Sequence, residues 1–303
     1  MSADRRGAFV ALLVCMVSFG GTWPAGEVAA RHVEPAVVAV VRFSSAAVLL
    51  WIWARVSGKP VRLPKRSDLP LLLALGFSVV FAYNLFFLYG VRHAPATDGA
   101  VLVPGLIPGF TTLLAWPVLG DRPARRALLG LATAFVGVVI VADPTGGVGS
   151  RRLIGDALFL GASISWAVYT LVGREATLRF GSVSSNVFAT SIGSVLLLPV
   201  TFFGSGWASL ASASAGAWWS IAYLSVGGTV LGFVLFYEGV RLIGAQAASA
   251  FALLVPLLGV LSSVLVLGEP LRPALALGGA IVLAGLWLVQ TPRTAVEEVV
   301  AEA

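Results

Sequence analysis

Residues 87–92 read Phe-Leu-Tyr-Gly-Val-Arg, and residues 236–241, which lie 149 positions further on, read Phe-Tyr-Glu-Gly-Val-Arg. Each stretch ends a long apolar run. The match continues at a spacing of 148, where Leu119-Gly120-Asp121 corresponds to Leu267-Gly268-Glu269. An ordered series of matches indicates an internal repeat, because chance similarity between apolar segments would not keep the order. We therefore expect two similar halves.

The composition places both halves in a membrane. Of the 303 residues, 58% are apolar and 11% are charged, whereas roughly 25% of residues are charged in an average soluble domain. A water-soluble fold of this length could not bury so much apolar surface. A helix needs about 20 apolar residues to cross a hydrocarbon core about 30 Å thick, and most of the chain divides into runs of that length.

Ten apolar runs can be marked, separated by short segments with charged or turn-forming residues. The first run follows Arg5 and Arg6 and resembles a signal peptide, but nine further runs follow it, so we expect an uncleaved first helix. None of the connections is long enough for a soluble domain. The expected spans are 7–30, 35–53, 69–91, 96–119, 127–141, 153–172, 185–203, 218–237, 247–267 and 274–290.

The basic residues set the expected orientation. With the N-terminus in the cytoplasm, fourteen of the 20 Lys and Arg residues lie on the inner side, five lie on the outer side, and Arg42 lies within the second span. This excess predicts a multi-pass protein of the inner (plasma) membrane with both termini cytoplasmic. The net charge of +6 is spread over the connections rather than along one polar face, which argues against nucleic-acid binding.

Five spans per repeat is an odd number, so the second repeat must enter the membrane upside down relative to the first. The predicted fold class is an all-α integral membrane protein with ten transmembrane helices in two inverted five-helix repeats. The repeats are expected at 7–142 and 153–290, followed by a cytoplasmic tail at 291–303. Two such halves can exchange conformations and open a central site to either side in turn, which favours a transporter.

Three motifs add a family resemblance over nearly the whole chain. The first span contains Ser18-Phe19-Gly20-Gly21-Thr22-Trp23, and the second runs from Pro35 through Arg42-Phe43. The fourth and ninth spans each contain a proline followed by Leu-Gly-Asp or Leu-Gly-Glu. These motifs resemble the EamA-type branch of the drug/metabolite transporter superfamily.

The resemblance implies a ten-helix exporter or importer of metabolites, with a central cavity between the halves and no ATPase of its own. Members of that family handle amino acids, nucleosides, sugars and toxic organic compounds. Glu238 departs from the family pattern, which more often has an uncharged residue there. It is a candidate for proton coupling, as is Glu27.

Glu27 and Arg42 are ionisable residues within apolar spans, where a charge at a helix centre costs roughly 2.5–3.5 kcal/mol. Trp23, Glu27 and Arg31 are spaced four apart and share one helical face. At the outer mouth of a cavity, Glu27 could take up a proton and Arg42 could attract a carboxylate or phosphate. Alternatively, the two form a structural salt bridge that fixes the first hairpin. The sequence leaves both readings open.

Aromatic and amide side chains at mid-span are candidates for a cavity wall, since they offer stacking faces and a few hydrogen bonds. Packing between helices is the alternative for each of them. Prolines are included because they interrupt their spans, and the missing backbone donors permit kinks and expose carbonyls. The expected cavity residues are Trp23, Glu27, Arg42, Tyr83, Asn84, Phe87, Pro108, Trp166, Tyr169, Tyr237, Gln246 and Pro256.

Three further acidic residues lie at the ends of spans. Asp98 is near the start of the fourth span, where capping of a helix N-terminus is the expected role. Asp121 and Glu269 lie at equivalent ends of the two repeats. For these two we expect capping between a loop and a helix rather than contact with a substrate.

Other function classes are less well supported. The single cysteine, Cys15, lies in an apolar run, and His32 and His93 are isolated from any Cys or His partner, so we expect neither a metal nor a cofactor. No nucleophile and base are placed together at membrane depth, as an enzyme would need. A channel or signalling protein should show a polar stripe or a sensory domain.

The sequence thus predicts a secondary transporter without enzymatic activity, exporting small metabolites that are amino-acid-like or other small organic compounds. A membrane-embedded enzyme and a channel or signalling protein are the alternatives. The expected partners are a small-molecule substrate and the lipid bilayer, and a homodimer is left open.

Overall fold

The computed structural model describes residues 3–58, 61–120, 123–142, 150–203, 206–243 and 251–290. Within these ranges the chain forms helices and no strand. Eight helical segments are long and apolar enough to cross a membrane, and two shorter apolar helices complete the set. These ten correspond to the ten expected spans, which confirms the all-α, two-repeat membrane fold. The expected tail at 291–303 lies outside the described residues.

The first half of the described chain contains the helices of the first five spans. The first span is built from two helices and the third from two helices joined by a π-helix. These elements are α1 (Ala3–Gly20), α2 (Thr22–His32), α3 (Pro35–Val56), α4 (Leu69–Gly76), η2 (Phe77–Ala82), α5 (Tyr83–His93), α6 (Ala96–Leu119) and α7 (Arg125–Ala142).

The second half follows the same order. Its eighth span again contains a π-helix, and a short helix, α10 (Ala208–Ala211), precedes that span. The elements are α8 (Ser150–Phe180), α9 (Ser182–Leu197) with its extension η3 (Leu198–Phe202), α11 (Ala215–Ser225), η4 (Val226–Leu231), α12 (Gly232–Ile243), α14 (Leu254–Leu267) and α15 (Pro273–Gln290).

The structural repeat has the same spacing as the sequence repeat. The π-helices η2 and η4 begin at residues 77 and 226 and are both six residues long. Helices α7 and α15 begin at residues 125 and 273 and are both 18 residues long. Gly120 and Gly268 end α6 and α14 in the left-handed conformation, with φ of 77° and 68°, which glycine adopts without a steric penalty.

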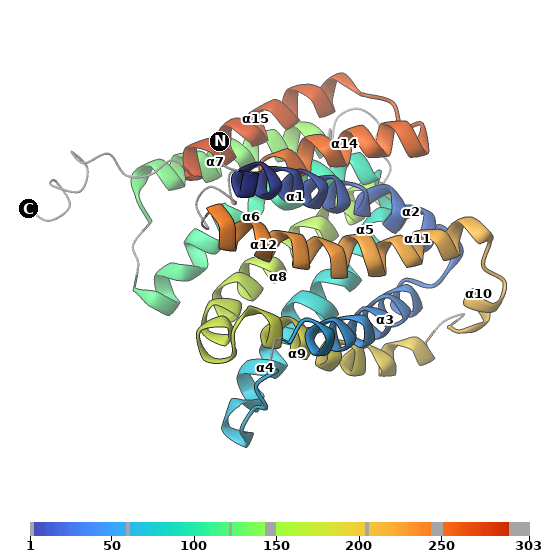
Figure 1. Cartoon of the computed structure of the whole chain (residues 1–303). Coiled ribbons are helices and arrows are strands. Elements are labelled where there is room, and N and C mark those ends of the chain that lie inside the picture. The colour runs from blue at the N-terminus through green and yellow to red at the C-terminus, as the bar shows by residue number, and fades with distance from the viewer. Residues whose placement is uncertain are drawn as a thin grey trace, which may run out of the picture.

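Helices α7 and α15 lie against each other, as Figure 1 shows at the top of the molecule. Glycines allow the backbones to approach closely. A Cβ on Gly130 would lie 2.7 Å from the carbonyl oxygen of Gly285, and a Cβ on Gly278 would lie 2.6 Å from that of Gly137. Small residues at helix interfaces are typical of membrane proteins, where close packing takes the place of hydrophobic burial in driving association.

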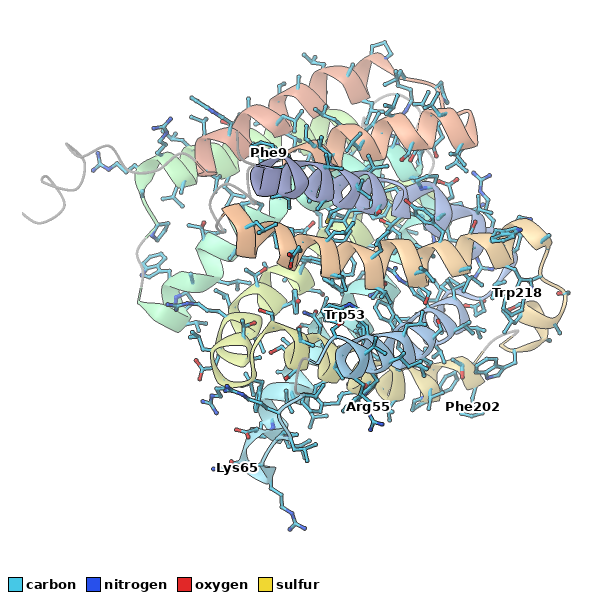
Figure 2. All side chains as sticks on the ribbon, in the orientation of Figure 1. Phe9, Trp53, Arg55, Lys65, Phe202 and Trp218 are labelled. Carbon is cyan, nitrogen blue, oxygen red and sulfur yellow. The ribbon has the colours of Figure 1, made fainter. Side chains whose placement is uncertain are left out.

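The outside of the bundle is apolar. Large hydrophobic side chains are exposed along most spans; Phe9, Phe202 and Trp218, labelled in Figure 2, are among them. Phe202 is 80% exposed. In water such a surface would drive aggregation, whereas in a bilayer it contacts lipid chains. The protein is therefore a multi-pass membrane protein.

The bundle has two faces at which the spans begin and end. The N-terminal face carries the start of α1, the end of α3 and the ends of α6 and α8. The opposite face carries the ends of α2 and α5 and the starts of α6 and α8. Each span crosses from one face to the other, so consecutive spans run antiparallel.

The prolines behave differently from expectation. Helix α6 runs without interruption through Pro104, Pro108 and Pro117, so the expected break of the fourth span is wrong. Neighbouring helices pack against α6 along its length, so the helix persists although each proline lacks a backbone N–H donor. In the ninth span, helix α14 begins at Leu254. Pro256 lies in this first turn, where its missing N–H would have no intrahelical partner.

Candidate functional site

Arg42 lies in α3 and is buried between the two repeats. Its Nε donates a hydrogen bond to Thr229 Oγ1 at 3.2 Å, and its Nη1 donates one to Asn84 Oδ1 at 3.1 Å. Its guanidinium carbon lies 4.8 Å from the centroid of the Phe43 ring. Asn84 belongs to the first repeat and Thr229 to the second, so Arg42 joins the repeats at membrane depth.

The charge of Arg42 is not balanced by a carboxylate. In the described ranges its polar partners are the amide of Asn84 and the hydroxyl of Thr229, both neutral, and no ion pair includes it. An isolated charge in the hydrocarbon region is costly and marks a functional site by default.

The π-helices orient both partners of Arg42. Asn84 Nδ2 donates to the carbonyl oxygen of Val79 at 2.8 Å, and Thr229 Oγ1 donates to that of Leu224 at 2.9 Å. Each carbonyl lies five residues before the donor, which is the spacing of a π-helix. The side chains thus satisfy carbonyls within the widened turns and direct their own oxygens toward the guanidinium. π-Bulges in helices frequently occur at functional sites.

Five of the expected cavity residues form one chain of aromatic contacts. The ring centroids of Trp23 and Phe87 are 5.0 Å apart, those of Phe87 and Tyr83 are 6.1 Å apart, and those of Tyr83 and Trp166 are 4.9 Å apart. Tyr169 continues the chain at 5.4 Å from Trp166. These distances fall within the usual range for aromatic pairs.

The two ends of this aromatic chain differ in burial. Trp23 and Phe87 are 3% and 2% exposed. Trp23 packs against the fully buried Phe159 and against glycines of α6 and α14, and Phe87 packs against Gly26 of α2. At this end of the aromatic chain the residues pack between helices, which was the alternative to a role in the cavity wall. Tyr83, Trp166 and Tyr169 are half-buried, so that their faces are the ones available to a small molecule.

A cavity of about 370 Å³ lies between the second halves of α6 and α8, toward the N-terminal face. Its volume is within the range of small-molecule sites. Its wall is mostly aliphatic and ends on one cation and one carboxylate near the face. The lining residues are Leu114, Val118, Val168, Leu171, Val172, Arg174 and Glu175. None of the expected cavity residues is among them; Tyr169 precedes Leu171 by two positions on α8.

Glu27 and Arg42 do not form the salt bridge that was one of the two expectations for them. Glu27 Oε1 pairs with Arg31, and its Oε2 accepts a hydrogen bond from the backbone N–H of Ala96 at 2.9 Å. The free N–H groups at the start of α6 attract the carboxylate, because a helix N-terminus carries partial positive charge. Glu27 therefore belongs to the opposite face, and Arg42 to the centre.

The remaining charges at the start of α6 complete an ion cluster, which we define as Glu27, Arg31, Asp98, Arg152, Glu269 and Arg272. Glu269 accepts from the backbone N–H groups of Ala96 and Thr97, both at 3.0 Å, which confirms the expected capping between a loop and a helix. Asp98 does not cap the helix. It pairs with Arg152 at 2.8 Å and with Arg272.

The ion cluster ties four parts of the chain together at the opposite face. Glu27 comes from α2, Asp98 from α6, Arg152 from α8, and Glu269 and Arg272 from the connection between α14 and α15. These segments belong to both repeats. The contacts close the opposite face, while the cavity lies toward the N-terminal face.

Several expected site residues are not brought to the centre. Pro108 lies half-buried in α6, and Pro256 lies one turn before Gly259, whose backbone packs on Trp23. Glu238 is half-buried on α12 and takes part in an interaction of its own. The side chain of Tyr237, and Gln246 and Asp121 as a whole, lie outside the described residues.

Two residues of interest, Thr229 and Asp156, are not singled out by the sequence analysis. Thr229 gave no local signal, because threonine is common in membrane helices and its partner lies 187 positions away. Asp156 could have been found, since it is an acidic residue inside an apolar span, the same rule that singled out Glu27. It is 5% exposed and lies one turn after Arg152 on α8.

The comparisons with known proteins agree with this architecture. Residues 5–142 and 153–291 each match the model of the EamA-like transporter family. The chain belongs to the EamA-like transporter family.

Relatives of this EamA-like protein match it over nearly their full length. An uncharacterized transporter of Bacillus subtilis, YyaM, is 27% identical over 282 residues, covering 92% of both chains. A probable terminal-alkyne amino-acid exporter of Streptantibioticus cattleyicolor is 28% identical over 279 residues, again covering 92% of both. A solved crystal structure matches with a TM-score of 0.65 and 18% identity, covering 98% of this chain and 99% of the other. This last likeness shows the fold alone.

With the family established, this EamA-like protein is a membrane transporter and not an enzyme. Its Arg42 site lies where the two repeats meet, between their π-helices, and its ion cluster lies at the opposite face. Inverted-repeat transporters place substrate sites near the midplane at the repeat interface.

Proposed function

We propose that the protein exports small amino-acid-like carboxylates by alternating access, and that Arg42 binds the substrate carboxylate. The observation that carries the proposal is the buried charge of Arg42, which is bonded to neutral partners from both repeats. Guanidinium groups recognise carboxylates through paired, charge-assisted hydrogen bonds. A bound carboxylate would neutralise the charge that the protein leaves unbalanced.

The surroundings of Arg42 support an organic anion rather than an inorganic one. Asn84, one of its partners, directly follows Tyr83, which begins the half-buried part of the aromatic chain. A substrate held by its carboxylate at Arg42 could therefore place an apolar or amino-bearing group against Tyr83 and Trp166. The name of the Streptantibioticus cattleyicolor relative, an amino-acid exporter, supports the same class.

The arrangement of the two faces supports an inward-open state. We infer that the N-terminal face is cytoplasmic. Fourteen Lys and Arg residues belong to segments assigned to that face and five to segments assigned to the opposite face, and basic residues are enriched on the cytoplasmic side of a membrane protein. The cavity lies toward this face and the ion cluster closes the opposite one. A substrate would thus enter from the cytoplasm and leave when the ion cluster separates, across the inner (plasma) membrane.

The test compares the medium of cells that express wild type, Arg42→Gln and Arg55→Gln at matched levels in the membrane. Arg55 is exposed near the end of α3, so its substitution removes the same charge without touching the site. We expect wild type and Arg55→Gln to enrich an amino-acid-like carboxylate in the medium. For Arg42→Gln, the loss of a charged hydrogen bond, about 1.5–3 kcal/mol, predicts export reduced by about 10- to 150-fold.

Two results would count against the proposal. Export by Arg42→Gln at the wild-type rate would show that Arg42 only joins the repeats. Enrichment of a neutral or cationic compound would refute the carboxylate class. Arg42→Lys separates the roles further, because it keeps the charge and loses the paired geometry, so partial export is expected from it.

A further inference from the structure

Asp156 is the buried group that the proposed mechanism does not use. Both of its carboxylate oxygens are buried and have no hydrogen-bond partner, a combination that no other side chain of the described ranges shows. The residue is 5% exposed. An ionised carboxylate in this setting would be unbalanced and unsolvated, which strongly favours the neutral, protonated form.

The charges around Asp156 belong to the ion cluster. On its own helix, Arg152 lies one turn earlier and is held by Asp98, with a second bond to the carbonyl oxygen of Val141 on α7 at 2.6 Å. Asp98 on α6 and Arg272 before α15 also act on Asp156 through their charges. Both arginines are thus engaged by Asp98 and not by Asp156.

The other elements near Asp156 add further ionisable groups. The end of α5 packs against Gly155 through Ala94 and carries Arg92 and His93. Arg92 is paired with Glu34, and His93 bonds the carbonyl oxygen of Tyr89. At the start of α6, the carboxylates of Glu27 and Glu269 share the N–H of Ala96, so these two are the competing proton sites.

The spacing of Arg152 and Asp156 provides a switch. Residues four apart on a helix are neighbours, so an Arg152 released from Asp98 could pair with Asp156 without movement of the α8 backbone. An opening of the opposite face that separates the start of α6 from the start of α8 breaks this pair, because Asp98 lies on α6 and Arg152 on α8. An Arg152 paired with Asp156 would favour the ionised form.

We propose that Asp156 is a proton-binding site of the gate at the opposite face. It holds a proton while Asp98 engages Arg152 and Arg272, and it loses that proton to the external water when the gate opens and Arg152 turns to Asp156. The ligand is a proton rather than a metal ion, because two arginines lie beside the site. The inference rests on the proposed alternating access, since it needs a gate that opens.

The sign of the pH effect follows from linkage. Opening releases one proton, so a higher external pH favours the open gate, by up to about tenfold in the open-to-closed ratio per pH unit. The effect is confined to the pH range in which Asp156 is protonated in the closed state and ionised in the open one. Low external pH keeps the gate closed.

The experiment measures opening directly rather than transport. The reporter is Thr97→Cys in a Cys15→Ser background; Thr97 is 1% exposed beneath the ion cluster. A membrane-impermeant maleimide is added to intact cells between about pH 5.5 and 8.5. The control is Ala211→Cys, an exposed position in α10 on the same face. Its labelling rate reports how the reactivity of a thiol itself depends on pH, and the labelling rate of Thr97→Cys is divided by it.

We expect the normalised labelling rate to rise with pH in the otherwise unchanged protein. Asp156→Asn and Asp156→Leu should abolish this rise and leave labelling slow; the leucine variant guards against a folding defect, because it buries no polar group. Glu269→Gln should keep the rise. A pH slope that persists in both Asp156 variants, or one that disappears in Glu269→Gln instead, would overturn the proposal.

A further outcome concerns the proposed function rather than Asp156. If Thr97→Cys is not labelled at any pH, even when Asp98→Asn removes both ion pairs, then the gate does not open and alternating access itself is refuted. If labelling is fast but independent of pH without any change at Asp156, the gate opens and the proton site alone is refuted.

Discussion

Two adjacent glycines of α15 allow a direct test of how closely the repeats pack. A Cβ on Gly278 would lie 2.6 Å from the carbonyl oxygen of Gly137 and 2.9 Å from the backbone nitrogen of Val141. A Cβ on Gly279 would find its nearest atoms, the methyl groups of Val101, at 3.7 Å. Both glycines are buried in the same helix, so each serves as the matched control of the other.

The magnitude follows from two effects. Replacing a helical glycine by alanine stabilises a helix by about 1 kcal/mol, and this gain is the same at both positions. Overpacking costs about 1–3 kcal/mol, and it applies to Gly278→Ala alone because backbone atoms on α7 cannot rotate away. The free energy of unfolding of Gly278→Ala should therefore lie about 1–3 kcal/mol below that of Gly279→Ala.

The assay is reversible unfolding in mixed micelles, with the helical signal followed as the denaturing detergent is increased. Gly137→Ala should resemble Gly278→Ala, since its Cβ would lie 2.6 Å from the carbonyl oxygen of Gly278. The loss of unfolding free energy in the double variant Gly137→Ala/Gly278→Ala should also be smaller than the sum of the losses in the two single variants, because both substitutions act at one contact. Equal stability of Gly278→Ala and Gly279→Ala would refute the close approach of α7 and α15.

Two further predictions concern the core and the opposite face. Phe159→Ala should lower the free energy of unfolding by about 3–5 kcal/mol, because this ring is fully buried against Trp23; a loss below 1 kcal/mol in the same assay would show that the site is loosely packed. Glu269→Ala should cost about 0.5–2 kcal/mol by removing the acceptor of two N–H groups of α6. Glu269→Gln should cost less because it keeps one acceptor oxygen, and equal losses would count against capping.

Much of the fold follows from the sequence alone. The ten spans, their order and the two repeats depend on the length of apolar runs and on a spacing of 148–149 residues, both of which are properties of the chain itself. The aromatic residues Trp23, Tyr83, Phe87, Trp166 and Tyr169 are among the cavity residues expected from the sequence, with packing between helices as the alternative, but the sequence does not say that they touch one another. The structure joins all five.

The partners of the charged residues depended on tertiary structure. Arg42 bonds Thr229 of the other repeat, and Glu27 turns to the start of α6 instead of to Arg42. Which donor a buried charge reaches depends on the rotation and register of packed helices, and apolar periodicity does not encode these. The unpartnered state of Asp156 is of the same kind. A sequence shows that an acidic residue enters the membrane, but only the packed bundle decides whether any partner comes within hydrogen-bonding distance.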